Sequence, residues 1–230
     1  DPWFGGIVRA GGNITLKIGA TPTFVRGYET GVDRIPLPDR NDVRGTIRAK
    51  ALEPGGYYKG SIGNKSYYIV ELGLPSVGLM SVQGYDRNDN PVGLGEIVDI
   101  GLLNGTAWFE EDVRLSGVLD GQLTIGVDGN IEIWDDVVYE GSVPGGGGIN
   151  PDCDDILGLI AAGTSDGDII IKNTVPNQSD VEIHAVMMAL SSTLVAEDYQ
   201  HIGLVGSVML YGGLLAWDAE HIADYNHDII

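Results

Sequence analysis

A short acidic loop carries the densest group of side-chain oxygens in the chain. Asp86, Asn88, Asp89 and Asn90 lie close together and are followed by Pro91. Ca²⁺ takes about six to eight oxygen ligands from flexible loops, so these four residues are the candidate metal ligands and Ca²⁺ is the cofactor they would bind. The EF-hand pattern is not met, because the glycine and glutamate that it requires are missing. The alternative is a loop whose Asx side chains bond to its own backbone.

Runs of carboxylates are the second feature that could do chemistry. They occupy residues 110–112, 135–136 and 154–155. Glycosidases place two carboxyl groups around the scissile bond, one of them protonated, so a polysaccharide-degrading enzyme is one alternative for this chain. Neighbouring residues of a strand point to opposite faces, and one member of each pair is therefore expected to cap a turn. We expect no catalytic residues.

Other reactive groups are few. Cys153 is the only cysteine and cannot form an internal disulfide. Its acidic neighbours disfavour the thiolate, so we expect an inert, partly buried side chain. His221 and His227 lie among acidic residues, where a transition-metal site is the alternative to a solvated tail. The sequence contains no phosphate-binding loop, dinucleotide fingerprint or catalytic serine motif.

Both ends of the sequence are apolar, whereas chain ends are usually polar and frayed. Trp3 and Phe4 lie near the start, and Ile229 and Ile230 are the last two residues. Such side chains need to be buried, either as caps on this chain's own fold or against a neighbour. They are our candidate assembly residues, because strand addition between copies would build a homo-oligomer or a filament.

The charge balance excludes several partners. The chain has 33 acidic and 13 basic residues, a net charge of −20. Nucleic acid and anionic membranes would be repelled, so neither is expected as a partner. No apolar run reaches the roughly 18 residues of a membrane span. The sequence opens without Met, which suggests that a leader has been removed, and we expect a secreted or cell-surface protein.

The elements that must position these residues are predicted to be β-strands. Glycine is abundant, with 35 residues, and Gly, Asn and Asp separate most of the apolar runs, as in proteins with many tight turns. The segment from Val181 to Asp198 has some helical character but begins with period-two alternation, so we expect a strand. The other expected strands lie at residues 14–18, 67–72, 77–82, 97–103, 113–115, 123–125, 131–133, 169–171 and 206–215.

The spacing of these runs, roughly 8 to 13 residues, suits either a β-sandwich or the faces of a β-solenoid. The runs beside turns such as Asp120-Gly121 and Asp128-Gly129 are short, as solenoid faces usually are. We therefore predict an all-β protein, a parallel β-helix with decorating loops, with a β-sandwich as the alternative. The expected organisation is one domain over residues 1–230, divergent in 1–104 and more regular in 105–230. Loops are expected at residues 27–41 and 141–150.

The second half of the chain also carries a resemblance. The segments concerned are residues 112–117, 121–125, 129–139, 150–159, 179–185 and 206–213. Together they resemble an uncharacterised family of bacterial exported envelope proteins, some of which have pilin-like N-termini. The resemblance covers about residues 105–215 and implies a β-helix-like domain and export. It implies no activity.

These observations together predict a non-enzymatic structural protein of the cell surface or extracellular space. In this hypothesis the chain is a self-assembling, filament-forming subunit packed through its apolar ends. The first alternative is a carbohydrate- or Ca²⁺-dependent adhesive module that binds a surface glycan. Exposed rings of Tyr57, Tyr58, Tyr67 and Tyr68 would favour it if they formed a platform. The second alternative is the polysaccharide-degrading enzyme considered above.

Overall fold

The computed structural model consists mainly of β-strands, which confirms the all-β class. It describes residues 3–4, 7–10, 13–14, 21, 23–33, 38–63, 66–142, 149–150, 152–164, 167–178, 180–197 and 208–218. Two small parallel sheets lie in the N-terminal part, where β1 pairs with β3 and β2 with β4. The bounds of these strands are β1 Trp3–Phe4, β2 Val8–Ala10, β3 Thr23–Phe24 and β4 Tyr28–Thr30.

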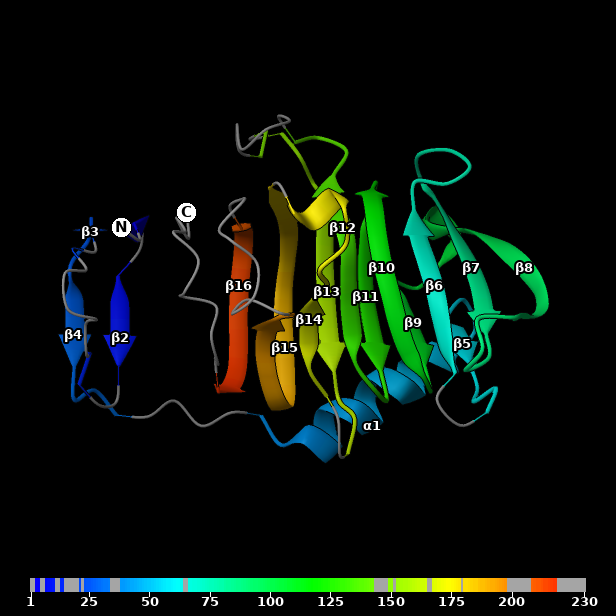
Figure 1. Ribbon diagram of the computed structural model, residues 1–230, viewed down its shortest axis with the longest axis horizontal. Coiled ribbons are helices and arrows are strands. Elements are labelled where there is room, and N and C mark those ends of the chain that lie inside the picture. The colour runs from blue at the N-terminus through cyan, green and yellow to red at the C-terminus, as the bar shows by residue number, and fades with distance from the viewer. Residues whose placement is uncertain are drawn as a thin grey trace.

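One helix and a large mixed sheet make up the remainder (Figure 1). The helix is α1 (Arg40–Ala51), and two short 3-10 helices are η1 (Ile100–Leu102) and η2 (Pro176–Gln178). The strands of the sheet are β5 Tyr57–Lys59, β6 Tyr67–Leu72, β7 Leu79–Tyr85, β8 Pro91–Asp99, β9 Thr106–Phe109, β10 Asp112–Leu119, β11 Gln122–Val127, β12 Ile131–Tyr139, β13 Ile156–Ala161, β14 Ile169–Ile171, β15 Val181–Ala196 and β16 Val208–Asp218.

Between β9 and β14, consecutive strands do not pair with each other, and each strand pairs with the next strand but one. β11 lies parallel to β9 and β13, and β12 lies parallel to β10 and β14. The long strand β15 contributes to both rows, since it pairs with β13 and with β14. The Asp-Gly turns at 120–121 and 128–129 therefore lead from one row to the other and close no hairpin. Antiparallel pairing occurs in β6–β7–β8, which makes the sheet mixed.

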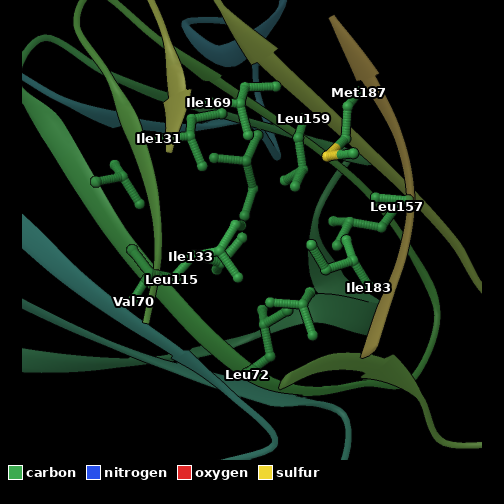
Figure 2. Packing of buried hydrophobic residues seen from close by; sticks show 14 of the residues in the cluster. Val70, Leu72, Leu115, Ile131, Ile133, Leu157, Leu159, Ile169, Ile183 and Met187 are labelled. Atoms are coloured by element: carbon green, nitrogen blue, oxygen red, sulfur yellow. The ribbon is translucent and has the colours of Figure 1, made fainter. Parts of the chain in front are cut away.

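The inward side chains of the two rows meet in one apolar core (Figure 2). Leu115 and Ile133 come from β10 and β12, while Leu157 and Leu159 come from β13 on the opposite side. All four are fully buried. Alternation explains the arrangement, because every second residue of each strand points inward. The apolar-x-apolar pattern of the sequence corresponds to these inward positions.

A row of polar side chains forms hydrogen bonds between strands that are neighbours in the sheet. Asp112 Oδ1 accepts a hydrogen bond from the backbone N–H of Asn130 at 2.7 Å, and Asn130 Oδ1 accepts one from Asp168 N–H at 2.9 Å. Asp168 Oδ1 then accepts from Thr193 N–H at 2.9 Å. The side chain of each residue thus satisfies a backbone donor at the equivalent position of the next strand. This ladder gives Asp168 a specific structural function.

Replacing Asn130 with alanine is expected to lower the free energy of unfolding by about 1–3 kcal/mol, because the partly buried Asp168 N–H loses its acceptor. Asn88→Ala is the matched control, since the bond of Asn88 to Asp86 is made by its backbone N–H. Urea unfolding followed by tryptophan fluorescence measures both variants. Equal stabilities for the two variants would contradict a structural contribution from the ladder.

Helix α1 was missed in the sequence analysis, which placed a loop over residues 27–41 and no helix after it. The helix begins after Asp39, whose carboxylate accepts hydrogen bonds from the N–H groups of Asn41 and Asp42 at 2.9 and 3.1 Å, an N-cap arrangement. Its apolar face is short: Val43, Ile47 and Ala51 pack against a second, smaller core. Because only three of the twelve residues pack on this core, the periodic signal in the sequence is weak.

Most other expected strands are found with shifted bounds. The segment from Val181 is a strand, β15, as predicted, and residues 169–171 form β14. The strand expected at 97–103 is wrong at both ends, because β8 starts at Pro91 and residues 100–102 form η1. Most of the expected strand at 14–18 lies outside the described residues, as do residues 143–148 of the second loop.

Candidate functional site

The outermost antiparallel strand, β8, is an apolar segment that is exposed at most of its positions. It pairs with β7 on one side, and the structure describes no strand on its other side. Leu94 is 94% exposed and Ile97 is 56% exposed, although both lie within a strand. Isolated exposed apolar residues are common, but a long apolar edge strand offers unpaired backbone groups to another chain.

Further exposed apolar side chains lie next to the end of β8. Leu74 and Val77 belong to the turn between β6 and β7, and Leu102 lies in η1, where it is 77% exposed. The backbone N–H of Ile100 donates to the carbonyl of Gly78 at 2.9 Å, which brings η1 and this turn together. The exposed apolar side chains of β8 and its flanking turns thus make up one group, with members on both faces of the strand. We call it the β8 edge: Leu74, Val77, Val92, Leu94, Ile97 and Leu102.

The single charged side chain in the middle of β8 is held by its neighbours. Glu96 forms an ion pair with Lys59 and accepts a hydrogen bond from Tyr57 Oη at 3.0 Å. The Lys59 ammonium lowers the pKa of Glu96, so its carboxylate is charged and paired at neutral pH. The centre of the β8 edge therefore carries no unbalanced charge.

The candidate metal loop immediately precedes β8. Asp86 Oδ1 accepts hydrogen bonds from the backbone N–H groups of Asn88 and Asn90 at 2.8 and 2.9 Å, and Asn90 Nδ2 donates to the same carboxylate. These hydrogen bonds lower the pKa of Asp86. Asp89 points elsewhere and accepts from Tyr67 Oη at 2.6 Å. Within the described residues no group of three or more His, Cys, Asp or Glu side chains is placed to hold a metal ion.

The adjacent carboxylates mostly bond to backbone. Asp136 Oδ1 accepts from Glu182 N–H at 2.8 Å, and burial raises the pKa of Asp136. Asp155 accepts from Gly121 N–H at 2.7 Å and from the Cys153 thiol at 3.1 Å. Burial raises the pKa of that thiol, in keeping with the inert cysteine expected from the sequence. Asp135 Oδ1 accepts from Asp136 N–H. These contacts are turn and strand caps.

An exposed platform of Tyr57, Tyr58, Tyr67 and Tyr68 is not formed, because two of the four side chains are buried. Tyr67 and Tyr68 are 7% and 4% exposed. Tyr67 stacks on Tyr85 with ring centroids 5.4 Å apart, and its other neighbour is the guanidinium of Arg114, whose Cζ lies 3.5 Å from the Tyr67 centroid. Burial first, and then the hydrogen bond to Asp89, raise the pKa of Tyr67 to about 12. The faces of the Tyr67 ring thus contact other side chains of this protein.

Sequence analysis also missed the cation–π stack around Arg114. The guanidinium lies between Tyr67 and Trp134, with Cζ 4.4 Å from the Trp134 ring. Glu132 accepts from Arg114 Nε at 3.0 Å and from Trp134 Nε1 at 2.9 Å. The register gives the reason: Arg114 and Glu132 are direct partners in β10 and β12, so the charges alternate along the outer face. Such a stack stabilises the outer face of the parallel strands.

A buried His–Glu pair lies between β12, β15 and β16. His184 is fully buried, and its Nδ1 accepts from the backbone N–H of Tyr139 at 3.1 Å. The proton is then on Nε2, which lies 2.9 Å from Glu182 Oε1. The rings of Tyr139 and Tyr211 meet the imidazole edge-on, with centroids 5.2 and 5.0 Å away. The imidazole replaces a backbone acceptor, a structural function that accounts for its burial.

Helix α1 is tied to the sheet by a charged cluster around Glu110. Its carboxylate is contacted by Arg48, with Nε at 2.9 Å, and by the hydroxyl of Tyr58. The hydrogen bond from Tyr58 and those from Arg48 lower the pKa of Glu110 below its ordinary value of 4.5. A carboxyl group with a lowered folded-state pKa stabilises the fold above its unfolded pKa, and this stabilisation is lost as the pH falls through the folded value.

Glu110→Gln is accordingly expected to lower the stability at pH 7, and this deficit should shrink as the pH falls below the ordinary pKa of 4.5 and through the lowered pKa of Glu110. The control is Glu53→Gln, because Glu53 forms an exposed pair with Lys50 and such pairs contribute about 0–1 kcal/mol. Urea titrations at pH 7 and pH 3.5 give the comparison. A Glu110→Gln deficit that persists unchanged at pH 3.5 would refute the electrostatic explanation.

Only two of the four candidate assembly residues at the chain ends are among the residues that the structure describes. Trp3 and Phe4 form β1, which runs parallel to β3, and their side chains are not described. Ile229 and Ile230 lie outside the described residues, as do His221 and His227. Helix α1, the only α-helix in the described segments, is too short and too polar to span a bilayer.

Comparisons with known proteins leave the chain without an assigned family. No family model matches it, and no significant match was found among curated proteins or solved structures.

Proposed function

We propose that this chain is a non-enzymatic structural protein of the cell surface or extracellular space that self-associates into larger assemblies. The single observation that carries the proposal is the β8 edge, an apolar strand that is exposed along most of its length. A protein that functions alone usually protects such an edge with Lys, Pro, a bulge or a covering element. β8 has a Pro and a bulge only near the hairpin end, at Pro91 and opposite Val82 and Gly84.

We propose further that the parallel part of the sheet is a short β-helix with α1 and the β7–β8 hairpin as decorations. Two rows of parallel strands in register, an apolar interior and the polar ladder from Asp112 to Thr193 all support this fold over a sandwich. Successive strands alternate between the rows, as in a coil. A rigid coil suits a structural protein, because each turn is held by its neighbours and extension adds further turns.

The remaining chemistry of the described residues supports a structural assignment. Asp136 and Asp155, which could have served in hydrolysis, accept hydrogen bonds from backbone N–H groups, and Tyr67, which could have met a glycan, contacts Tyr85 and Arg114. The net charge of −20 suits a protein that remains soluble outside the cell and has no nucleic acid partner. The Ca²⁺ site at residues 86–90 stays a prediction.

Electron microscopy of the purified chain at micromolar concentration, with Ca²⁺ and with a chelator, tests this function. Regular assemblies are expected, and their loss on chelation would assign the loop at 86–90 a structural metal. Single particles at every concentration, in both buffers, would overturn the proposal. Light scattering coupled to size-exclusion chromatography gives the mass of any smaller assembly in the same samples.

A further inference from the structure

The free side of β8 is arranged as one half of a two-stranded interface. In an antiparallel pair the backbone groups of alternate residues point toward and away from the partner strand. Ile100 donates inward to Gly78, so the alternation directs the N–H and C=O groups of Ile97 and Asp99 outward. Another strand supplies donors and acceptors at the same spacing, whereas a small ligand or a smooth apolar surface does not.

The side chains around this edge allow a close approach. Gly93 and Gly95 alternate with Val92, Leu94 and Glu96, so one face of the strand has no side chains at these two positions. A Cβ at Gly93 would meet no heavy atom within 4 Å, so the space beside this glycine is open, whereas a Cβ at Gly95 would lie 3.0 Å from Gln83 Oε1. The six residues of the β8 edge expose an apolar area on the order of 500 Å², the size of the largest patches on monomers and a large part of the ~800 Å² per partner of a stable complex.

The charges narrow the choice of partner. β8 holds two charged side chains: Glu96, which is paired with Lys59, and Asp99, whose carboxylate accepts a hydrogen bond from Gly101 N–H at 2.9 Å. A basic partner would find little to bind here, although the rest of the chain is strongly acidic. A second copy would be repelled by most of this acidic surface and would meet mainly apolar side chains at β8. Electrostatic repulsion between two copies is therefore expected to be weak at β8.

We propose that β8 pairs antiparallel with β8 of a second copy about a two-fold axis, continuing the sheet β6–β7–β8 from one molecule into the next. A two-fold contact uses the same patch on both molecules and is therefore self-complementary and closed. It produces a discrete dimer, and a filament needs another contact elsewhere on the molecule. This inference rests on the proposed self-association, and it names the surface that performs it.

The test compares Leu94→Asp with Val175→Asp in the full-length chain. Leu94 is 94% exposed in β8, whereas Val175 is 83% exposed in a turn next to η2, far along the chain from the edge. Both variants add one negative charge at an exposed apolar position, so both are expected to fold. Their circular dichroism spectra and melting curves check this before the association is measured.

Sedimentation velocity over a dilution series gives the dimer dissociation constant for the three proteins. Wild type and Val175→Asp should have the same dimer dissociation constant. The dissociation constant of Leu94→Asp should be more than about 30-fold higher. Association of Leu94→Asp equal to wild type would overturn the β8 interface and leave the proposed self-association standing. Equal weakening by both variants would also overturn it, since charge alone would then explain the effect. Wild type that stays monomeric would overturn both proposals.

Discussion

Replacing Gly117 with alanine is expected to lower the free energy of unfolding by about 3–5 kcal/mol, the sum of backbone strain and a steric clash. Gly117 lies in β10 where the register against β12 shifts, and its φ is +107°, a conformation that side chains rarely adopt. A Cβ at this position would lie 2.2 Å from the carbonyl oxygen of Leu72. Both the strand bend and the parallel neighbour β6 would have to move.

Gly45→Ala is the matched control for this prediction. Gly45 lies in the middle of α1, and a Cβ there meets no heavy atom within 4 Å. Alanine is favoured over glycine in a helix by about 0.5–1 kcal/mol, so this variant should be slightly more stable than wild type. Thermal and urea unfolding of both variants supply the numbers. A Gly117→Ala protein as stable as wild type would show that β10 does not bend against β6 as described.

The strands could be predicted from the sequence because their signal is local. Apolar and polar residues alternate at 131–133, which begin β12. The run at 169–171 is wholly apolar and forms β14. Asn, Asp and Gly precede these runs. The polar ladder also has a sequence signal that was not used. Asp112, Asn130 and Asp168 each stand immediately before such an apolar run, at the same position relative to the strand. An Asx residue repeated at the start of successive strands therefore indicates stacked turns.

The features that could not be predicted depend on contacts between distant parts of the chain. The tyrosines at 67 and 68 look like surface residues in a polar stretch, and only the position of Arg114 in the next strand shows that Tyr67 is covered. The N-terminal half of β8 was missed because Pro91, Gly93 and Gly95 are poor strand formers. Their presence at an edge is explained by pairing with β7, which no local pattern reveals.

Helix α1 escaped prediction for a related reason. Helix stability in proteins comes mainly from packing of an apolar face, and α1 presents only Val43, Ile47 and Ala51 to the sheet. The surface that receives them is built by residues far along the chain, among them Trp108, Ile160 and Leu190. This docking surface lies on the outer side of the strand row, opposite the main core. The helix is therefore a consequence of the sheet beneath it.

Trp108 is the centre of that docking surface, and Trp108→Ala is expected to cost about 3–5 kcal/mol, the range for deleting a buried aromatic side chain. The indole is fully buried and lies over Gly126, where a Cβ would be 2.6 Å from its ring. The absence of a side chain at residue 126 thus creates the space that the ring fills. Removing the ring leaves a cavity beneath Ile47, and α1 loses the largest side chain that it packs against.

Two further variants test whether the loss of stability comes from the volume of the Trp108 side chain, from its hydrogen bonding or from its position in the fold. Trp108 Nε1 has no hydrogen-bond partner among the described residues, so Trp108→Phe should retain most of the stability that Trp108→Ala loses. Trp134→Ala removes an indole from the outer face, where it contacts Arg114, and should cost about 1 kcal/mol. Unfolding curves rank the three, and limited trypsin digestion reports on α1, because cleavage at Arg44 and Arg48 accelerates if the helix undocks. Cleavage of Trp108→Ala at the wild-type rate would mean that the helix is held by its charged contacts with Asp128 and Glu110 and that the buried ring contributes little to docking.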